Sequence, residues 1–361
     1  MTDSSSPHHR HQPDTAASEA SCAHCPPGRA VRWYTQPKQW VLWVIVPFLA
    51  AGLVWRLLRP VAWTFFDYVS HTWWALGLGL IFGGLLERFV PEVYIAKLLA
   101  RPSPTTIALS TGLGFVFSGC SHGCLALSMA LHKKGASPAS VISFLLASPW
   151  ASLSMTLMMI SLFGLKGLVI VVAALVVAFV TGLAFLRLER RGAIEHNPHT
   201  VAIDATFSIA QDIRRRASQY RLTRSQLLKD VQAVARGAWA LADMVIWWIA
   251  IGFFLSGLLG AFIPHAAFVR YFGPTLLGLL ATMALATVIE TCSEGSAPLA
   301  FEFFKQTGAL GNSFAFLMGG VVTDATELGL VWTNIGKKTA CWMVALTLPQ
   351  VFLLAWLLNH W

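Results

Sequence analysis

Two short motifs carry the residue types that bind soft metals and metalloids. The first contains Cys120, His122 and Cys124, and the second contains Cys292 and Glu294. Thiolates bind thiophilic centres and imidazole binds many metals, so these five side chains are the candidate substrate ligands. Trivalent arsenic, which binds two or three sulfur atoms, is a guest that such a set would accept. The motifs therefore predict a binding site for a small thiophilic solute.

The two motifs belong to an internal repeat. When Cys120 is aligned with Cys292, the following two dozen residues need no gap, and both copies interrupt apolar stretches. A break at corresponding points of two halves indicates a transporter's substrate site. The alternative is that glycine and serine serve helix packing while the cysteines fill small apolar spaces. The coinciding identical pairs are Ser121/Ser293, Gly123/Gly295, Leu127/Leu299, Lys133/Lys305, Phe144/Phe316 and Leu145/Leu317.

Carboxylates inside apolar segments form a second candidate set. Asp67 and Asp243 occupy comparable early positions in the two halves, and Asp324 and Glu327 follow the second motif. An ionisable group in a bilayer costs at least about 2.5–3.5 kcal/mol, so it usually faces a cavity or a partner. These four residues are predicted to couple transport to protons, or else to ligate cations. The alternative is that they lie near the interface or in structural pairs.

The amino-terminal tail offers a third, separate group of ligands. The tail comprises residues 1–38. Its first 30 residues are rich in serine, proline, histidine and alanine, a composition typical of disorder. Within the tail, Cys22, His24 and Cys25 are close enough to capture a soft metal ion. An incidental flexible tail explains the same residues equally well.

Composition assigns the chain to the multi-pass membrane class. Of its 361 residues 56% are hydrophobic and only 12% are charged, with 15 tryptophans. The net charge of +9 is concentrated in one loop and beside the first apolar segment, which indicates topology and contact with anionic lipid, not nucleic-acid binding. No P-loop motif is present, so direct use of ATP is not expected, and neither is a cofactor.

The apolar pattern predicts an all-α polytopic membrane protein made of two inverted repeats and one extra N-terminal span. Its parts are the tail at 1–38, the first span at 39–60, repeat 1 at 61–187, a basic cytoplasmic loop at 188–233 and repeat 2 at 234–361. Each repeat is expected to hold a broken re-entrant hairpin, at 105–131 and 276–304, whose arms are too short to cross a bilayer. Single spans are predicted at 61–86, 138–163, 167–186, 234–263, 310–333 and 339–358.

Orientation follows from the distribution of lysine and arginine. The stretch from Arg187 to Arg236, which contains the central loop, carries ten of them and should be cytoplasmic, which places the tail on the same side. Three crossings per repeat, an odd number, then invert the second half relative to the first. The carboxyl terminus is expected on the outer side.

The stretches around the motifs resemble the predicted-permease family that includes bacterial organoarsenical efflux permeases. The resemblance runs through SGCSHGCLALSMALHKKGASPASVISFLLASP and CSEGSAPLAFEFFKQTGALGNSFAFLMGG, and covers most of residues 61–358. It implies export of small thiophilic compounds, with Cys120, Cys124 and Cys292 as the matching positions. Family members often have Cys-Ser-Cys in the first motif, where this chain has His122. They also tend to be uncharged where this chain has Asp324 and Glu327, a departure that suits a more cationic metal or metalloid species.

The leading hypothesis is an inner-membrane permease that exports a trivalent organoarsenical or similar solute by proton-coupled transport. The first alternative is a carrier of soft or divalent metal ions that uses His122, Glu294, Asp324 and Glu327. The second, from another class, is a membrane thiol–disulfide oxidoreductase with Cys120 and Cys124 as its redox pair, because cysteines four apart share a helix face. Under the leading hypothesis, the expected partners of the protein are the solute, protons and membrane lipid, and no nucleic acid is expected.

Overall fold

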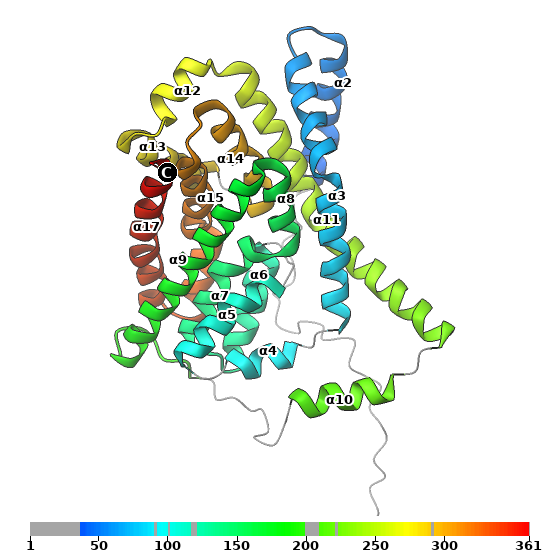
Figure 1. The fold of residues 1–361 in the computed structure, drawn as a ribbon, viewed down its shortest axis with the longest axis vertical. Helices are drawn as coiled ribbons and strands as arrows, with labels where there is room; N and C mark the ends of the chain where they lie inside the picture. The colour runs from blue at the N-terminus through cyan, green and yellow to red at the C-terminus, as the bar shows by residue number, and fades with distance from the viewer. Residues whose placement is uncertain are drawn as a thin grey trace, which may run out of the picture.

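The computed structural model describes residues 37–89, 92–99, 102–116, 121–198, 209–220, 223–289 and 292–360, and every regular element among them is a helix. Figure 1 shows a bundle with α10 and the start of α11 set apart from it. The first half contains α1 (Pro37–Trp40), the π-helix η2 (Val41–Ile45), α2 (Val46–Val54), α3 (Arg59–Phe89), α4 (Glu92–Leu99), α5 (Pro104–Val116), α6 (Ser121–Lys133), α7 (Pro138–Ala151), α8 (Leu153–Phe163) and α9 (Leu165–Arg190).

The second half repeats this order of helices. After α10 (Ile209–Gln219), it contains α11 (Arg224–Phe262), α12 (His265–Phe272), α13 (Leu276–Ile289), α14 (Ser293–Thr307), α15 (Leu310–Thr323), α16 (Ala325–Asn334) and α17 (Lys337–Asn359). Five helix starts recur 172 residues apart: Pro104 and Leu276, Ser121 and Ser293, Pro138 and Leu310, Leu153 and Ala325, Leu165 and Lys337. The internal repeat thus extends over a whole set of helices, well beyond the two motifs.

Capping residues fix the repeated breaks. The Ser152 hydroxyl accepts the amide N–H of Met155 (3.2 Å) at the start of α8, and the repeat-related Asp324 carboxylate accepts that of Thr326 (2.8 Å) at the start of α16. A side-chain acceptor at this position satisfies a helix-terminal N–H that has no partner inside the helix. The segments 138–163 and 310–333, predicted as single spans, therefore each consist of two helices. Helices α7 and α8 meet at a bend of 45°, whereas α15 and α16 together form one candidate span.

Five described helices are long and apolar enough to cross a membrane, or seven if each bent pair is one span. The predicted all-α membrane fold is therefore confirmed, whereas the insertion of the hairpins is not tested by these helix lengths. Two boundaries differ from expectation. Helix α11 begins at Arg224, inside the segment predicted as a loop, and the predicted first span is helical only over 37–54. The apolar helical part of this first span, Trp43–Val54, is shorter than the roughly 20 residues that span a bilayer, so its crossing stays a prediction.

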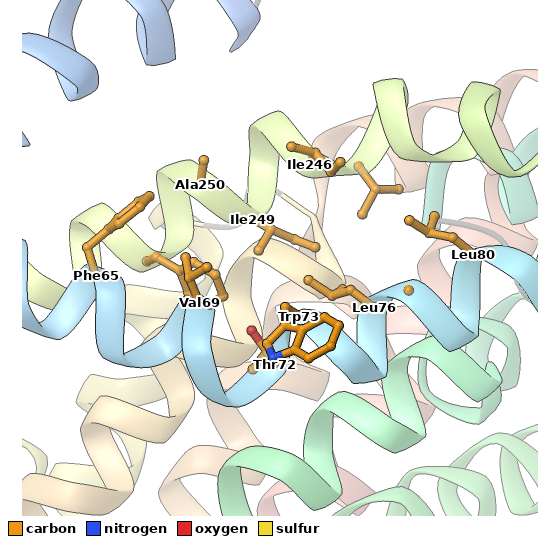
Figure 2. Close-up of a pocket in the computed structure, with 12 residues that line it drawn as sticks. Phe65, Val69, Thr72, Trp73, Leu76, Leu80, Ile246, Ile249 and Ala250 are labelled. Atoms are coloured by element: carbon orange, nitrogen blue, oxygen red, sulfur yellow. The ribbon is translucent and has the colours of Figure 1, made fainter.

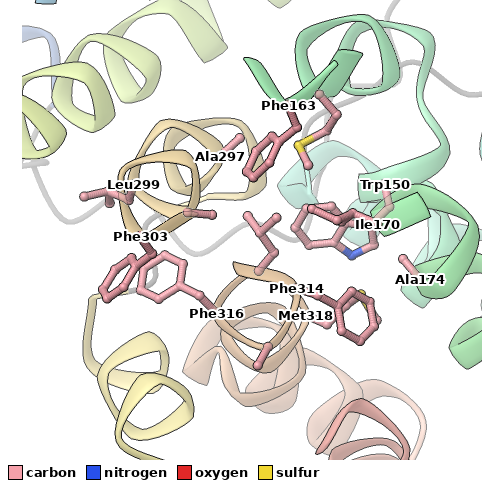
Figure 3. Packing of buried hydrophobic residues seen from close by; sticks show 14 of the residues in the cluster. Trp150, Phe163, Ile170, Ala174, Ala297, Leu299, Phe303, Phe314, Phe316 and Met318 are labelled. Atoms are coloured by element: carbon pink, nitrogen blue, oxygen red, sulfur yellow. The ribbon is translucent and has the colours of Figure 1, made fainter. Parts of the chain in front are cut away.

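Two large hydrophobic clusters hold the bundle together. One joins α8, α14 and α15, where Figure 3 shows Trp150, Phe163, Phe314 and Met318 from both halves packed against each other. The other joins α5, α6 and α7 to α15, α16 and α17. Each half therefore completes its core with helices of the other half. The two repeats form one packed unit, which can position residues from both motifs.

The segment after α9 fastens the two halves together. The Glu195 carboxylate accepts the amide N–H of Lys338 (2.9 Å) and both the amide N–H (3.0 Å) and hydroxyl (2.9 Å) of Thr339, and so caps α17. Gly336 has φ +156°, and a Cβ there would lie 2.1 Å from the Glu195 side chain. Asn197 donates to the carbonyls of His132 and Ala136 at the end of α6 (2.7 Å each).

The Glu195 cap predicts acid sensitivity. Burial acts to raise the pKa of this carboxyl, but the hydrogen bonds from Lys338 and Thr339 outweigh it and hold the pKa below its ordinary value. A carboxyl with a lowered folded-state pKa stabilises the fold at pH values above its unfolded pKa, and this contribution is lost as the pH falls through the folded-state pKa. Glu195→Ala should therefore lower the thermal unfolding temperature at pH 7 and have a smaller effect near pH 3. An equal loss at both pH values would contradict the assignment.

Candidate functional site

The second motif lies at the break between α13 and α14. Cys292 has extended backbone and is the N-cap of α14, where its Sγ accepts the amide N–H of Gly295 (3.3 Å). Its side chain is 3% exposed. The next residues are also buried, and the Ser293 hydroxyl donates to Glu294 Oε2 (3.0 Å). A thiol and a carboxyl therefore sit together at a helix N-terminus, where N–H groups stabilise negative charge.

A ridge of small residues on α11 holds this helix end in place. Gly252 packs so closely that a Cβ would lie 2.1 Å from the carbonyl oxygen of Gly295. One turn after Gly252, the buried Ser256 hydroxyl donates to the Gly252 carbonyl of the same helix. Two turns after Gly252, a Cβ at Gly260 would lie 2.5 Å from the Glu302 carboxylate. Small residues at this spacing let two helix backbones approach. The position of the second motif thus depends on α11.

Part of the first motif lies outside the described residues. Cys120 precedes the described start of α6, and the side chain of His122 is not described. Cys124 lies in the first turn of α6 and is 2% exposed. Neither Cys124 nor Cys292 forms a disulfide in this structure. The meeting of Cys120, Cys124 and Cys292, predicted from the repeat, stays a prediction.

The two motif helices pack against helices of the opposite repeat. Helix α6 contacts α16, and α14 contacts α8. Because α8 and α16 are repeat-related, these contacts are reciprocal. Asp324 and Glu327 follow the second motif along the chain. In the structure, however, Asp324 caps α16 and Glu327 lies in it, and this helix packs on α6, the helix of the first motif. At the other contact, Met155 occupies the position of Glu327. The two motif environments therefore differ in charge.

The predicted coupling residues differ in burial. Glu327 is 2% exposed, whereas the side chain of Asp67 is 58% exposed and lies 3.4 Å from His71 Nδ1. Asp243 is exposed and accepts the indole N–H of Trp247 on its own helix (3.3 Å). Asp324 caps α16, as described above. Of these four, only Glu327 is enclosed by protein.

One buried polar pair was not predicted from the sequence. The Tyr68 hydroxyl of α3 donates to Glu302 Oε2 of α14 (2.6 Å), and Gln306 donates to Glu302 Oε1 (2.8 Å). Nothing in the local pattern marks Tyr68, because it lies 234 residues from Glu302 along the chain. The pair ties α3 to the helix that carries Cys292.

An apolar cavity of about 360 Å³ lies between α3 and α11. Figure 2 shows its labelled lining, which includes Trp73, Leu76 and Ile249. The hydroxyl of Thr72 donates to the carbonyl of Tyr68 (2.7 Å), so it is already satisfied. None of the candidate ligands whose side chains the structure describes, Cys124, Cys292 and Glu294, lines this cavity. It is therefore distinct from the site at Cys292 and Glu294.

The metal-binding prediction for the tail cannot be followed in the structure, because Cys22, His24 and Cys25 lie outside the described residues. Among the side chains that the structure does describe, no group of three or more His, Cys, Asp or Glu residues is arranged to hold a metal ion. This statement does not extend to Cys120 or to the side chain of His122.

Comparison with known proteins assigns the chain to a family. A model of a predicted permease family, ArsP_1, matches residues 59–360. UPF0718 protein YcgR of Bacillus subtilis (strain 168) is 23% identical over 279 residues, which are 72% of this chain and 84% of that protein. No solved structure matches. Since the family model covers most of the chain, and since the structure has the long apolar helices of a multi-pass membrane protein, this chain belongs to the predicted permease family.

Proposed function

We propose that this permease exports a small thiophilic solute across the inner membrane, most simply a trivalent organoarsenical, and that a proton gradient drives export. The observation that carries the proposal is the buried Cys292 at the start of α14. Its sulfur faces a helix amide, and Glu294 lies beside it. Thiolates bind soft centres, and a helix N-terminus favours the charged form of a ligand. A packing cysteine would not need this position.

The arrangement of the repeats supports alternating access. In Figure 1 the short helices α4 and α12, which occupy corresponding places in the two halves, lie at opposite ends of the bundle. We infer inverted repeats, with the motif helices entering from opposite sides. The hairpin arms have 13 to 15 residues, which is about 20–22 Å of helix and too short to cross a bilayer of about 30 Å. Their ends would then lie within the membrane.

We assign the proton-carrying role mainly to Glu327. It is buried on α16, a helix that packs on α6, the helix of the first motif. A carboxyl in this position can respond to solute bound at Cys124 and still change its protonation when the helices move. Asp67 and Asp243 lie on the bundle surface. Their exposure fits contact with water or lipid head groups better than a role in coupling.

Transport into everted membrane vesicles tests the proposed function. Vesicles that contain the protein should accumulate trivalent methylarsenical, and a protonophore should abolish the accumulation. Antimonite and divalent cations serve as competing substrates in parallel assays. Accumulation of divalent cations without that of any arsenical would favour the metal-ion carrier and reject the organoarsenical proposal.

The same vesicles test the assignment of Glu327. Glu327→Gln keeps the shape of the side chain but removes its titratable proton, so uptake should no longer increase with an imposed pH gradient. Asp243→Asn, which makes the same chemical change at an exposed site, should retain most of the response. If Asp243→Asn alone loses it, the coupling group is on α11 and the assignment to Glu327 is wrong.

A further inference from the structure

A second cavity lies between α3 and α11, near the end of α3. It has a volume of about 330 Å³, and its described lining has two arginines, Arg88 and Arg236, among small residues. The small residues are Gly84, Ala233, Gly237 and Ala240. No carboxylate is among these lining residues, so the cavity is positively charged.

The two arginines differ in their existing contacts. Arg88 donates through Nε (3.1 Å) and Nη2 (2.8 Å) to the same carboxylate oxygen, Asp230 Oδ1. Tyr220 and Gln226 also donate to Asp230, which therefore holds Arg88 in place without lining the cavity. Arg236 donates only to the carbonyl of Gln232 on its own helix (3.3 Å) and forms no ion pair with any described residue. It can bind an anion without losing a partner.

The surroundings match the boundary between lipid tails and head groups. Trp239, one turn from Arg236 on α11, is 75% exposed, and tryptophan is enriched at membrane interfaces. On α3, the exposed Ile81 and Leu85 lie within two turns of Arg88. Acyl chains can cover these apolar side chains while a phosphate enters the cavity. The same end of the bundle carries α4 and α10 (Figure 1), and α10 has three consecutive arginines, Arg214, Arg215 and Arg216.

We propose that this cavity binds the phosphate of an acidic phospholipid, with Arg236 and Arg88 as its ligands and the acyl chains against α3. Basic pockets between membrane helices are suited to such head groups. Arginine binds phosphate through two parallel N–H groups of its planar guanidinium, whereas lysine acts as a compact point charge. A lipid bound here would stabilise the crossing of α3 and α11, where a Cβ at Gly84 would lie 2.4 Å from the carbonyl oxygen of Val234.

Native mass spectrometry of the full-length protein tests the site. Purified protein is mixed with phosphatidylglycerol or with phosphatidylcholine, and retained lipid is counted. The wild type should retain phosphatidylglycerol preferentially, and Arg236→Gln should bind it about fivefold more weakly. Lys229→Gln is the matched control: it removes one exposed positive charge from the same end of α11 but leaves the cavity lining unchanged. Its binding should equal that of the wild type.

Ala240→Trp provides a second variant that keeps every charge. Ala240 is exposed on α11, so the larger side chain should be tolerated while it fills the cavity, and phosphatidylglycerol binding should fall as it does in Arg236→Gln. Equal losses in Lys229→Gln and Arg236→Gln would reduce the effect to general surface charge and overturn the site. Equal retention of both lipids would also overturn it. Displacement of the lipid by equimolar inorganic phosphate would show a phosphate site instead.

Discussion

Cys292→Ser should abolish export of trivalent arsenicals while the protein remains folded and inserted at normal abundance. The substitution is nearly isosteric, and a serine hydroxyl can also accept the Gly295 amide N–H that the Cys292 sulfur accepts (3.3 Å). The capping of α14 is therefore preserved while the soft ligand is lost. Cells that express the variant should lose arsenical resistance, and vesicle uptake should fall at least about tenfold, as expected when a direct ligand is removed.

Cys341→Ser is the matched control for this experiment. Cys341 is a free, exposed thiol on α17, away from both motifs. Its replacement should leave uptake and resistance unchanged. If Cys292→Ser transports at the wild-type rate, the buried cysteine is a packing residue. The carboxylates would then become the leading candidate ligands, and the metal-ion carrier would be the better description.

The local pattern was sufficient to locate the helices because their ends are encoded by nearby residues. The Ser137 hydroxyl and Pro138 together mark the start of α7, and Gly308, with φ +69°, ends α14. Breaks in apolar periodicity at the two motifs predicted the half-length helices around residues 117–120 and 290–291. Each of these signals spans one or two helical turns, so it survives in a single sequence.

The helix ends at Ser152 and Asp324 were missed because apolar residues continue on both sides of each cap. Hydropathy averaged over a span cannot register a single capping side chain. The hydrogen bond from the Thr326 amide to Asp324 therefore gives this residue a capping role that the sequence did not predict, and its predicted coupling role stays a prediction. The sequence did contain one signal for these helix starts: Ser152 and Asp324, two residues that favour N-caps, occupy the same position in the two repeats. This signal is visible only when the alignment of the two repeats is extended beyond the cysteine motifs.

Contacts between the two repeats could not be predicted from the sequence either. The sequence did not predict that α16, which carries Glu327, packs against α6, the helix of the first motif. Likewise, Tyr68 and Glu302 are linked by a buried hydrogen bond although each lies in an ordinary apolar segment. Such pairs depend on how two repeats interlock. The position of either residue in its own helix carries no information about that arrangement.

Gly252→Ala should disrupt the second motif more than any other single methyl addition on α11. The new Cβ would lie 2.1 Å from the Gly295 carbonyl oxygen, a backbone atom that can move only if α14 moves. Overpacking of this kind costs about 1–3 kcal/mol, and the displacement would shift Cys292 and Glu294 together. We therefore expect a lower unfolding temperature in detergent and loss of arsenical uptake.

Two other glycines separate this effect from a general intolerance of alanine. At Gly260 the added Cβ would meet the end of the Glu302 side chain and not a backbone atom, so Gly260→Ala should displace α14 less and have a smaller effect on uptake. At Gly112, on α5, no described atom lies within 4 Å of the added Cβ. Because alanine favours helix over glycine, Gly112→Ala should be neutral or slightly stabilising. A Cβ 2.1 Å from the Gly295 carbonyl oxygen forces α14 to move away from α11. If Gly252→Ala nevertheless transports at the wild-type rate, the close packing of α11 on α14 is not what holds the Cys292 motif in its working position.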